Sequence, residues 1–161
     1  MDQNVKQESL ASFPLQLALK FNSSVIPLHV ISTVLCTALQ WDEMSIIQRV
    51  LLTAAQIVNV TVEMLRIPLA FHGNLCENIS SLSGFLITST VVQLPLTTFL
   101  LMNTSFPKMP IQYALYTVFF LFLVFEVITG VRQMGIIAKD QMMKYAQLVM
   151  KQELDKSQPV Q

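Results

Sequence analysis

Charged residues inside apolar stretches of the sequence are costly and often functional. Glu63 and Arg66 are three residues apart near the end of one stretch, and Glu126 lies in another. Acids in such positions either form a proton or cation path or fix the packing of helices as a buried polar layer. No internal repeat typical of transporters is detectable. We therefore favour the polar layer, and a small transporter or channel that uses Glu63 and Glu126 is the alternative.

His72 and Cys76 come closest to a nucleophilic site, because an imidazole four residues from a thiol can activate it. Gly73 and Asn74 stand between them and are expected to break the helix that would align the two side chains. The two cysteines and two histidines of the chain lie in unrelated contexts, which predicts neither a disulfide framework nor a metal site. We predict no catalytic, metal-binding or cofactor-binding residues and no enzymatic activity.

The composition is typical of a membrane protein. Apolar residues make up 53% of the 161 residues and charged residues only 12%, against ~25% charged in a soluble domain. The formal net charge is zero, so nothing favours a nucleic-acid partner. The expected partner is the lipid bilayer.

Four apolar segments approach the ~20 residues that a membrane-spanning helix needs. They cover residues 24–40, 46–69, 82–102 and 111–131. Short connections between them predict an all-α membrane protein, a four-helix transmembrane bundle with up-down-up-down topology. Residues 1–23 are assigned to a cytosolic N-terminal tail, within which 10–19 form a short amphipathic segment on the membrane surface.

Lysine and arginine predict the orientation, because they are in excess on the cytosolic side of a membrane. The side that holds both predicted termini contains Lys6, Lys20, Arg66, Arg132, Lys139, Lys144, Lys151 and Lys156. The other side contains Arg49 and Lys108. Both termini are therefore predicted to be cytosolic.

Four N-glycosylation sequons occur, at Asn22, Asn59, Asn78 and Asn103. The predicted topology leaves only Asn103 facing away from the cytosol. Its closeness to the membrane makes glycosylation unexpected.

Residues 132–161 are predicted to form a cytosolic amphipathic helix followed by a frayed tail. Apolar residues recur from Met134 to Val149 at spacings of three and four, the period of an α-helix. One interpretation places this helix on the inner leaflet, held by anionic lipid. The other makes it a partner-binding helix whose methionines adapt to different surfaces. We favour the first.

The second span carries a polar face, because Gln56, Asn59, Glu63 and Arg66 are spaced by three, four and three residues. Lipid cannot satisfy these groups, so the face must look into the bundle or at a helix of a homo- or hetero-oligomer. Gln93 and Glu126 are the partners that the other spans offer.

Three further roles are expected for residues near this face. Arg66 should pair with Glu63 and extend to the membrane interface. Gly73 and Asn74 should end the second helix. Pro95 should kink the third span and form a notch for a neighbour.

The stretch EMLRIPLAFHGNL, residues 63–75, resembles the signature E-x-x-R-L-x-x-G-x-x-G-N-L of a family of small four-span membrane proteins that includes transmembrane proteins 17, 80 and 216. Glu63, Arg66, Gly73, Asn74 and Leu75 match at the family's spacing, whereas Ile67-Pro68 and Ala70 depart from it. Further similar stretches at 9–22, 83–103 and 119–134, the second containing the Q-L-P-L of Gln93 and Pro95, extend the resemblance over roughly residues 9–135.

The resemblance implies a role that composition cannot show. Members of this family are components of the ciliary transition zone, in the assembly named after Meckel–Gruber syndrome, together with tectonic proteins. That assembly controls which membrane proteins enter the cilium and supports ciliogenesis and Hedgehog signalling. The family has no attributed enzymatic activity. The implied location is the ciliary membrane at the transition zone.

Overall fold

The computed structural model describes residues 10–157, the last three by their backbone alone, and the elements in this range are helical. Four segments are long and apolar enough to cross a membrane. They are α1 (Phe13–Leu39), α2 (Ile46–Leu75), the run of α3 (Ile79–Ile87), η2 (Thr88–Gln93) and α4 (Leu94–Met102), and α5 (Pro110–Ser157), with the short η1 (Trp41–Glu43) between α1 and α2. The predicted all-α, four-span fold is confirmed.

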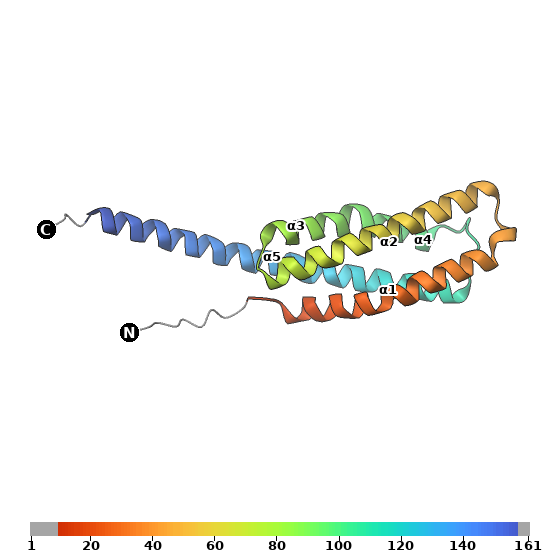
Figure 1. Ribbon diagram of the computed structural model, residues 1–161, viewed down its shortest axis with the longest axis horizontal. Helices are drawn as coiled ribbons and strands as arrows, with labels where there is room; N and C mark the ends of the chain where they lie inside the picture. The colour runs from red at the N-terminus through yellow and green to blue at the C-terminus, as the bar shows by residue number, and fades with distance from the viewer. Residues whose placement is uncertain (1–9, 158–161) are drawn as a thin grey trace.

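The four spans run back and forth and lie side by side (Figure 1). One cluster of buried apolar side chains, including Leu15, Leu82 and Ile137, fills the end of the bundle where α1 begins. A second cluster, including Met44 and Leu100, fills the opposite end. The middle of the bundle, between these two clusters, is where buried polar side chains gather.

The first span is longer than predicted. The expected helix was 24–40, preceded by a surface segment at 10–19, but α1 begins at Phe13 and is continuous. Leu15 and Leu19 are fully buried in the core of the bundle. The polar residues Lys20 and Asn22 interrupt the apolar run in the sequence without interrupting the helix, so residues 13–23 belong to the bundle and not to a tail.

The second helix does not stop at Gly73 and Asn74, as had been expected. It continues to Leu75, and the chain turns at Glu77, whose φ of 52° is the left-handed conformation that ends the helix. Gly73 serves close packing instead. A Cβ atom added there would lie 2.7 Å from the backbone nitrogen of Leu82 and 2.9 Å from its Cα atom. The glycine therefore lets α3 cross α2 backbone to backbone.

Residues close in the sequence fix where the helices α2, α3 and α5 begin. Ser45 and Gln48 form a reciprocal capping box at the start of α2, and the Asn78 side chain accepts hydrogen bonds from two backbone N–H groups at the start of α3. Pro110 opens α5, where a missing N–H costs nothing. Lys108, just before it, donates to the carbonyls of Leu101 and Asn103 at the end of α4, and partial burial lowers its pKa.

The third span contains a π-helical segment, η2, that ends two residues before Pro95. Proline has no N–H to donate to the carbonyl four residues earlier, so the regular helical ladder cannot pass through this point. The residues before Pro95 therefore form a widened turn, and the kink expected at Pro95 stays a prediction.

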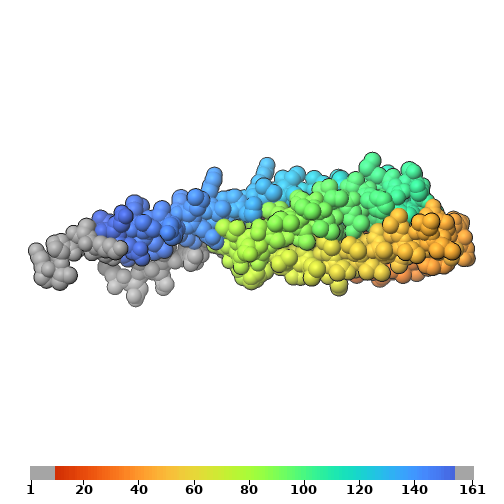
Figure 2. Space-filling view, turned by 90° about the horizontal axis from the view of Figure 1, so that it is seen from above, coloured from red at the N-terminus to blue at the C-terminus, as the bar shows by residue number. Residues whose placement is uncertain are grey.

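The predicted C-terminal helix is not a separate element. Residues 132–157 continue α5, which is 48 residues and therefore about 72 Å long, more than twice a hydrocarbon core of ~30 Å. Gln133 and Ile137 are still buried against the bundle, whereas every described side chain from Gln141 onward is exposed. Figures 1 and 2 show this extension leaving the bundle along its long axis. Its placement on a membrane surface stays a prediction.

The orientation in the membrane also stays a prediction. Arg66 is fully buried, so it leaves the count of positive charges at the membrane surface. Lys6 and the side chain of Lys156 lie outside the described residues, as do residues 1–9 of the predicted N-terminal tail 1–23 and residues 158–161 of the predicted C-terminal segment 132–161. The remaining charges still favour cytosolic termini.

Candidate functional site

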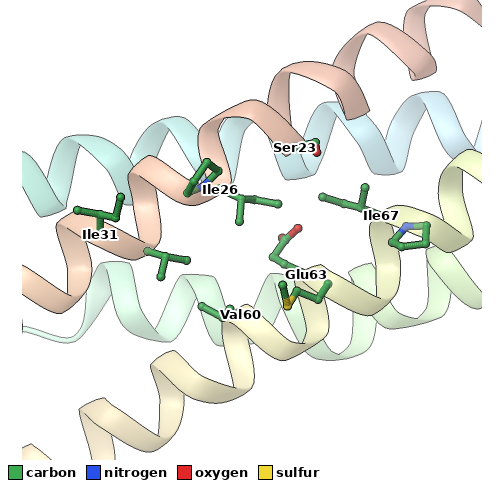
Figure 3. A pocket seen from close by; sticks show the side chains of 10 residues that line it. Ser23, Ile26, Ile31, Val60, Glu63 and Ile67 are labelled. Carbon is green, nitrogen blue, oxygen red and sulfur yellow. The ribbon is translucent and has the colours of Figure 1, made fainter.

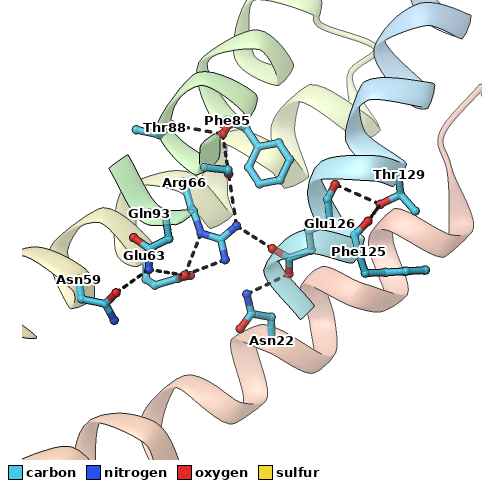
Figure 4. Close-up of polar contacts among 11 residues, drawn as sticks. Asn22, Asn59, Glu63, Arg66, Phe85, Thr88, Gln93, Phe125, Glu126 and Thr129 are labelled. Carbon is cyan, nitrogen blue, oxygen red and sulfur yellow. Dashed lines mark hydrogen bonds and ion pairs between the residues drawn. The ribbon is translucent and has the colours of Figure 1, made fainter. Parts of the chain in front are cut away.

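Arg66 is the centre of a polar cluster in the middle of the bundle (Figure 4). Its Nη2 atom lies 2.7 Å from Oε1 of Glu63, and its Nη1 atom lies 2.6 Å from Oε2 of Glu126. The predicted pair with Glu63 is present. The predicted extension of Arg66 to the membrane interface is wrong, because its side chain is 0% exposed and the Glu126 carboxylate on α5 holds it inside.

Glu126 receives its second partner from α1. Nδ2 of Asn22 donates a hydrogen bond of 2.9 Å to Oε1 of Glu126, and Asn22 is 1% exposed. Asn22 was not among the predicted site residues, because it lies in the predicted N-terminal tail and matches only a glycosylation sequon. Its spacing of three and seven residues from Leu19 and Leu15 was the available signal, since it places all three on one helical face.

Gln93 and Ser89 bring the third span into the cluster. Nε2 of Gln93 lies 2.9 Å from both Oδ1 of Asn59 and Oε1 of Glu63, so it joins two residues of the predicted polar face. The Ser89 hydroxyl donates to the carbonyl of Phe85 and accepts a long hydrogen bond from Arg66. Ser89 and Gln93 are both on η2, whose wider turn directs the two buried side chains toward α2.

All four spans thus contribute to one hydrogen-bonded network. It consists of Asn22, Asn59, Glu63, Arg66, Ser89, Gln93 and Glu126. Gln56, the remaining member of the predicted face, lies apart and bonds to Thr37 on α1. Most side chains of the polar face of α2 therefore face the interior of their own bundle.

The network lies deep in the bundle. The predicted distance of Glu63 from the end of its span was ~9 Å, on the assumption that the span ends near Leu69. Because α2 continues to Leu75, Glu63 is twelve residues, or about 18 Å, from that end. At such depth a charge must be neutralised by neighbours rather than by water.

Charges and hydrogen-bonding groups in the network do not balance. Two carboxyl groups face one guanidinium, so with all three groups ionised their formal charges would sum to one negative charge. Among the described residues, the buried oxygens Oε2 of Glu63, Oδ1 of Asn22 and Oε1 of Gln93 have no hydrogen-bond partner. The network therefore contains buried acceptor oxygens without a donor, which a proton on a carboxyl group or a donor from outside the chain would satisfy.

Asn74 forms a second polar contact at the end of the bundle. Its Oδ1 atom accepts from the backbone N–H of Ser12 at 2.9 Å, and its Nδ2 atom donates to the carbonyl of Ser12 at 3.0 Å. Nearby, the backbone of Leu10 donates to Glu77 and accepts from Gln133. These contacts, which we call the entry clamp, fix residues 10–12 against the ends of α2 and α5.

His72 and Cys76 are closer than predicted. Cys76 Sγ lies 3.5 Å from Nδ1 of His72, because α2 continues through Gly73 and Asn74. A nucleophilic pair also needs a group that orients the base. The neighbouring Glu77 carboxylate instead accepts from the backbone of Leu10, and the thiol is exposed. Among the described residues, no group of three His, Cys, Asp or Glu side chains could hold a metal ion.

Three of the predicted residues belong neither to the network around Arg66 nor to the entry clamp. Leu75 is 56% exposed at the end of α2. Pro95 lines a shallow hollow on the outside of α4. Asn103 caps the end of that helix, and its side chain accepts from the backbone of Ser105.

Comparisons with known proteins agree with this architecture. A family model described as a predicted membrane protein matches residues 17–129. Transmembrane protein 17 of the rat is 34% identical over 123 residues, 76% of this chain and 62% of that protein. The chicken protein of the same name is 35% identical, over 76% of this chain and 59% of its own length. The human one is 30% identical, over 78% and 63%.

The chain therefore spans about 60% of the length of the curated relatives that it matches. No solved structure matches it. The match covers the four spans and the network of charged and amide side chains between them. The chain is a multi-pass membrane protein and belongs to the transmembrane protein 17 family.

Proposed function

We propose that the protein is a non-enzymatic membrane component of the ciliary transition-zone complex, needed for ciliogenesis, for control of ciliary membrane composition and for Hedgehog signalling. The family resemblance supports this role, since it implies membership of an assembly that contains tectonic proteins. The single structural observation that carries it is the network around Arg66. A buried network of charged, amide and hydroxyl side chains that ties four spans together suits a rigid interaction module better than a catalyst.

The alternative of an ion or proton path through Glu63 and Glu126 is less compatible with the geometry. Arg66 lies within 2.7 Å of Glu63 and 2.6 Å of Glu126. A fixed guanidinium between two carboxylates repels a passing cation. Cation flux into liposomes that contain the protein, abolished by Glu126→Gln, would favour the alternative.

The location of the protein in ciliated cells tests the proposal. A tagged copy expressed in ciliated cells should concentrate at the base of the cilium and co-purify with tectonic proteins. The matched control is Gly135→Ala, a change in α5 where an added Cβ meets nothing within 4 Å; it should behave like the wild type. Uniform staining of the plasma membrane or endoplasmic reticulum would contradict the proposal.

A further inference from the structure

A groove runs along the outside of the bundle between α1 and α2, with a volume of about 590 Å³. Its walls are mostly apolar, and they include Ile26, Ile31, Val60 and Ile67. Figure 3 shows Glu63 on α2 pointing between the two helices toward α1, where Ser23 lies. A concave apolar site with a single convergent acid is the usual form of a binding site.

The acid in this groove has an unused oxygen. Oε1 of Glu63 carries all of the contacts to Arg66 and Gln93. Oε2 is buried and has no hydrogen-bond partner among the described residues, and the residue is 1% exposed. A buried carboxylate oxygen without a donor is costly, so the groove favours an occupant that brings one.

Two prolines add acceptors to the same groove. Pro27 and Pro68 line it, and each lies inside a helix. A proline withdraws the N–H that would pair with the carbonyl four residues earlier. These carbonyls belong to Ser23 and Met64, which also line the groove. Each proline therefore removes the usual helical donor of a carbonyl whose residue lines the groove, beside the carboxyl group of Glu63.

Depth decides which molecule can supply the donor. With α2 centred on a hydrocarbon core of ~30 Å, Glu63 lies roughly 10 Å below the nearer membrane surface. Lipid headgroups and their hydroxyls stay in the polar layer above this level. A side chain on a membrane-spanning helix is held at this depth by its backbone. A lysine there is itself costly unless it meets an acid, so the two groups would neutralise each other.

We propose that this groove binds a transmembrane helix of another protein that carries a lysine at mid-membrane depth, with the ammonium group donating to Oε2 of Glu63. This inference rests on the proposed role as an interaction component and names the chemistry of the partner. The apolar walls take the body of the partner helix, and the acid selects its register. With both carboxyl groups ionised, the added ammonium group would bring the summed formal charge of Glu63, Arg66, Glu126 and the lysine to zero.

The test uses a synthetic leucine–alanine transmembrane peptide with one central lysine, and a matched peptide with methionine in its place. Both are mixed with the full chain in phosphatidylcholine liposomes, and binding is measured by energy transfer. The lysine peptide should bind about tenfold tighter, as expected for a close charge pair. Glu63→Gln should abolish the difference between the peptides.

A second variant separates the groove from the folding of the network. Val60→Trp fills the groove without changing a charge and should block the lysine peptide. The control Val118→Trp fills a comparable hollow on α5 and should leave binding unchanged. Equal binding of the two peptides to the wild type, no binding, or a preference for the lysine peptide that persists in either Glu63→Gln or Val60→Trp would overturn the inference.

Other occupants give distinct results. Disulfide formation between two copies of Met64→Cys in a Cys76→Ser background would assign the groove to a second copy of this chain. Glu63-dependent labelling of the groove by a photoreactive sterol, without selective binding of the lysine peptide, would assign it to lipid. Either result overturns the inference. Neither changes the location of the protein in cells, so the proposed function is tested separately.

Discussion

Asn22 in α1 and Glu126 in α5 are 104 residues apart in the sequence and are joined by a hydrogen bond of 2.9 Å in the middle of the bundle. This bond connects the first span to the last, and Arg66 connects Glu126 onward to α2. The polar network thus links the four spans through hydrogen bonds and ion pairs. Its residues should contribute unequally to the free energy of unfolding.

Arg66→Leu should be strongly destabilising, because it leaves two buried carboxylates without a cation. Removing one partner of a buried ion pair costs about 3–5 kcal/mol. The free energy of unfolding can be measured in micelles by titration with sodium dodecyl sulfate. The triple variant Glu63→Gln, Arg66→Leu, Glu126→Gln should recover much of the loss, since it removes the charges together. Normal stability and normal location of Arg66→Leu would show that the network is dispensable.

Asn22→Leu should weaken the contact between α1 and α5. It removes the donor to Glu126, and hydrogen bonds between transmembrane helices contribute about 0.6–1.7 kcal/mol. The same denaturation assay measures the change. Ser23→Leu, one residue further along α1, is a control that leaves the Asn22–Glu126 bond intact. If both substitutions cost the same, the bond has no specific effect.

Gly73→Ala should separate α2 from α3. The added methyl group would lie 2.7 Å from the backbone of Leu82, which no side-chain rotation can relieve. Overpacking of this kind costs about 1–3 kcal/mol. Gly135→Ala is the matched control and should be neutral or slightly stabilising, because alanine favours helix more than glycine does. Cysteine cross-linking between the two helices reports the separation directly.

Asn74→Ala should release residues 10–12 from the entry clamp. The side chain makes both of its hydrogen bonds to the backbone of Ser12, and the change leaves two backbone groups without those partners. Limited proteolysis before α1 should become faster, and hydrogen exchange at Ser12 should rise. Leu75→Ala, next to it and 56% exposed, should change neither rate. Unchanged proteolysis of Asn74→Ala would show that Glu77 and Gln133 hold the segment without it.

The sequence predicted the spans and part of the network for one physical reason: lipid-facing surface requires long apolar runs, and polar groups inside them must find partners. Glu63, Arg66, Gln93 and Glu126 could be identified on this basis. Asn22 could not, because a polar residue at the edge of an apolar run has the same composition whether it is buried or in a tail. Its spacing from Leu15 and Leu19 favours the buried position, but its pairing with Glu126 is set only by the folded chain.

The prediction that Gly73 ends the second helix was wrong for a related reason. A glycine near the end of a helix can be a conformational stop or a site of close packing, and the sequence contains no information on which helix will cross it. The continuous α5 was not predicted because the change from apolar to mixed composition at Arg132 ends the apolar run of the sequence but does not end the helix.

The unbroken helix of α5 has a mechanical consequence. About 26 residues beyond the fourth span give a rod of roughly 39 Å that shares its axis with that span. A change in the tilt of the span by ~10° would move the tip of this lever by about 7 Å. A protein bound at the tip would therefore be held at a fixed distance from the bilayer. Its position would change when contacts with neighbouring proteins change the tilt of the bundle.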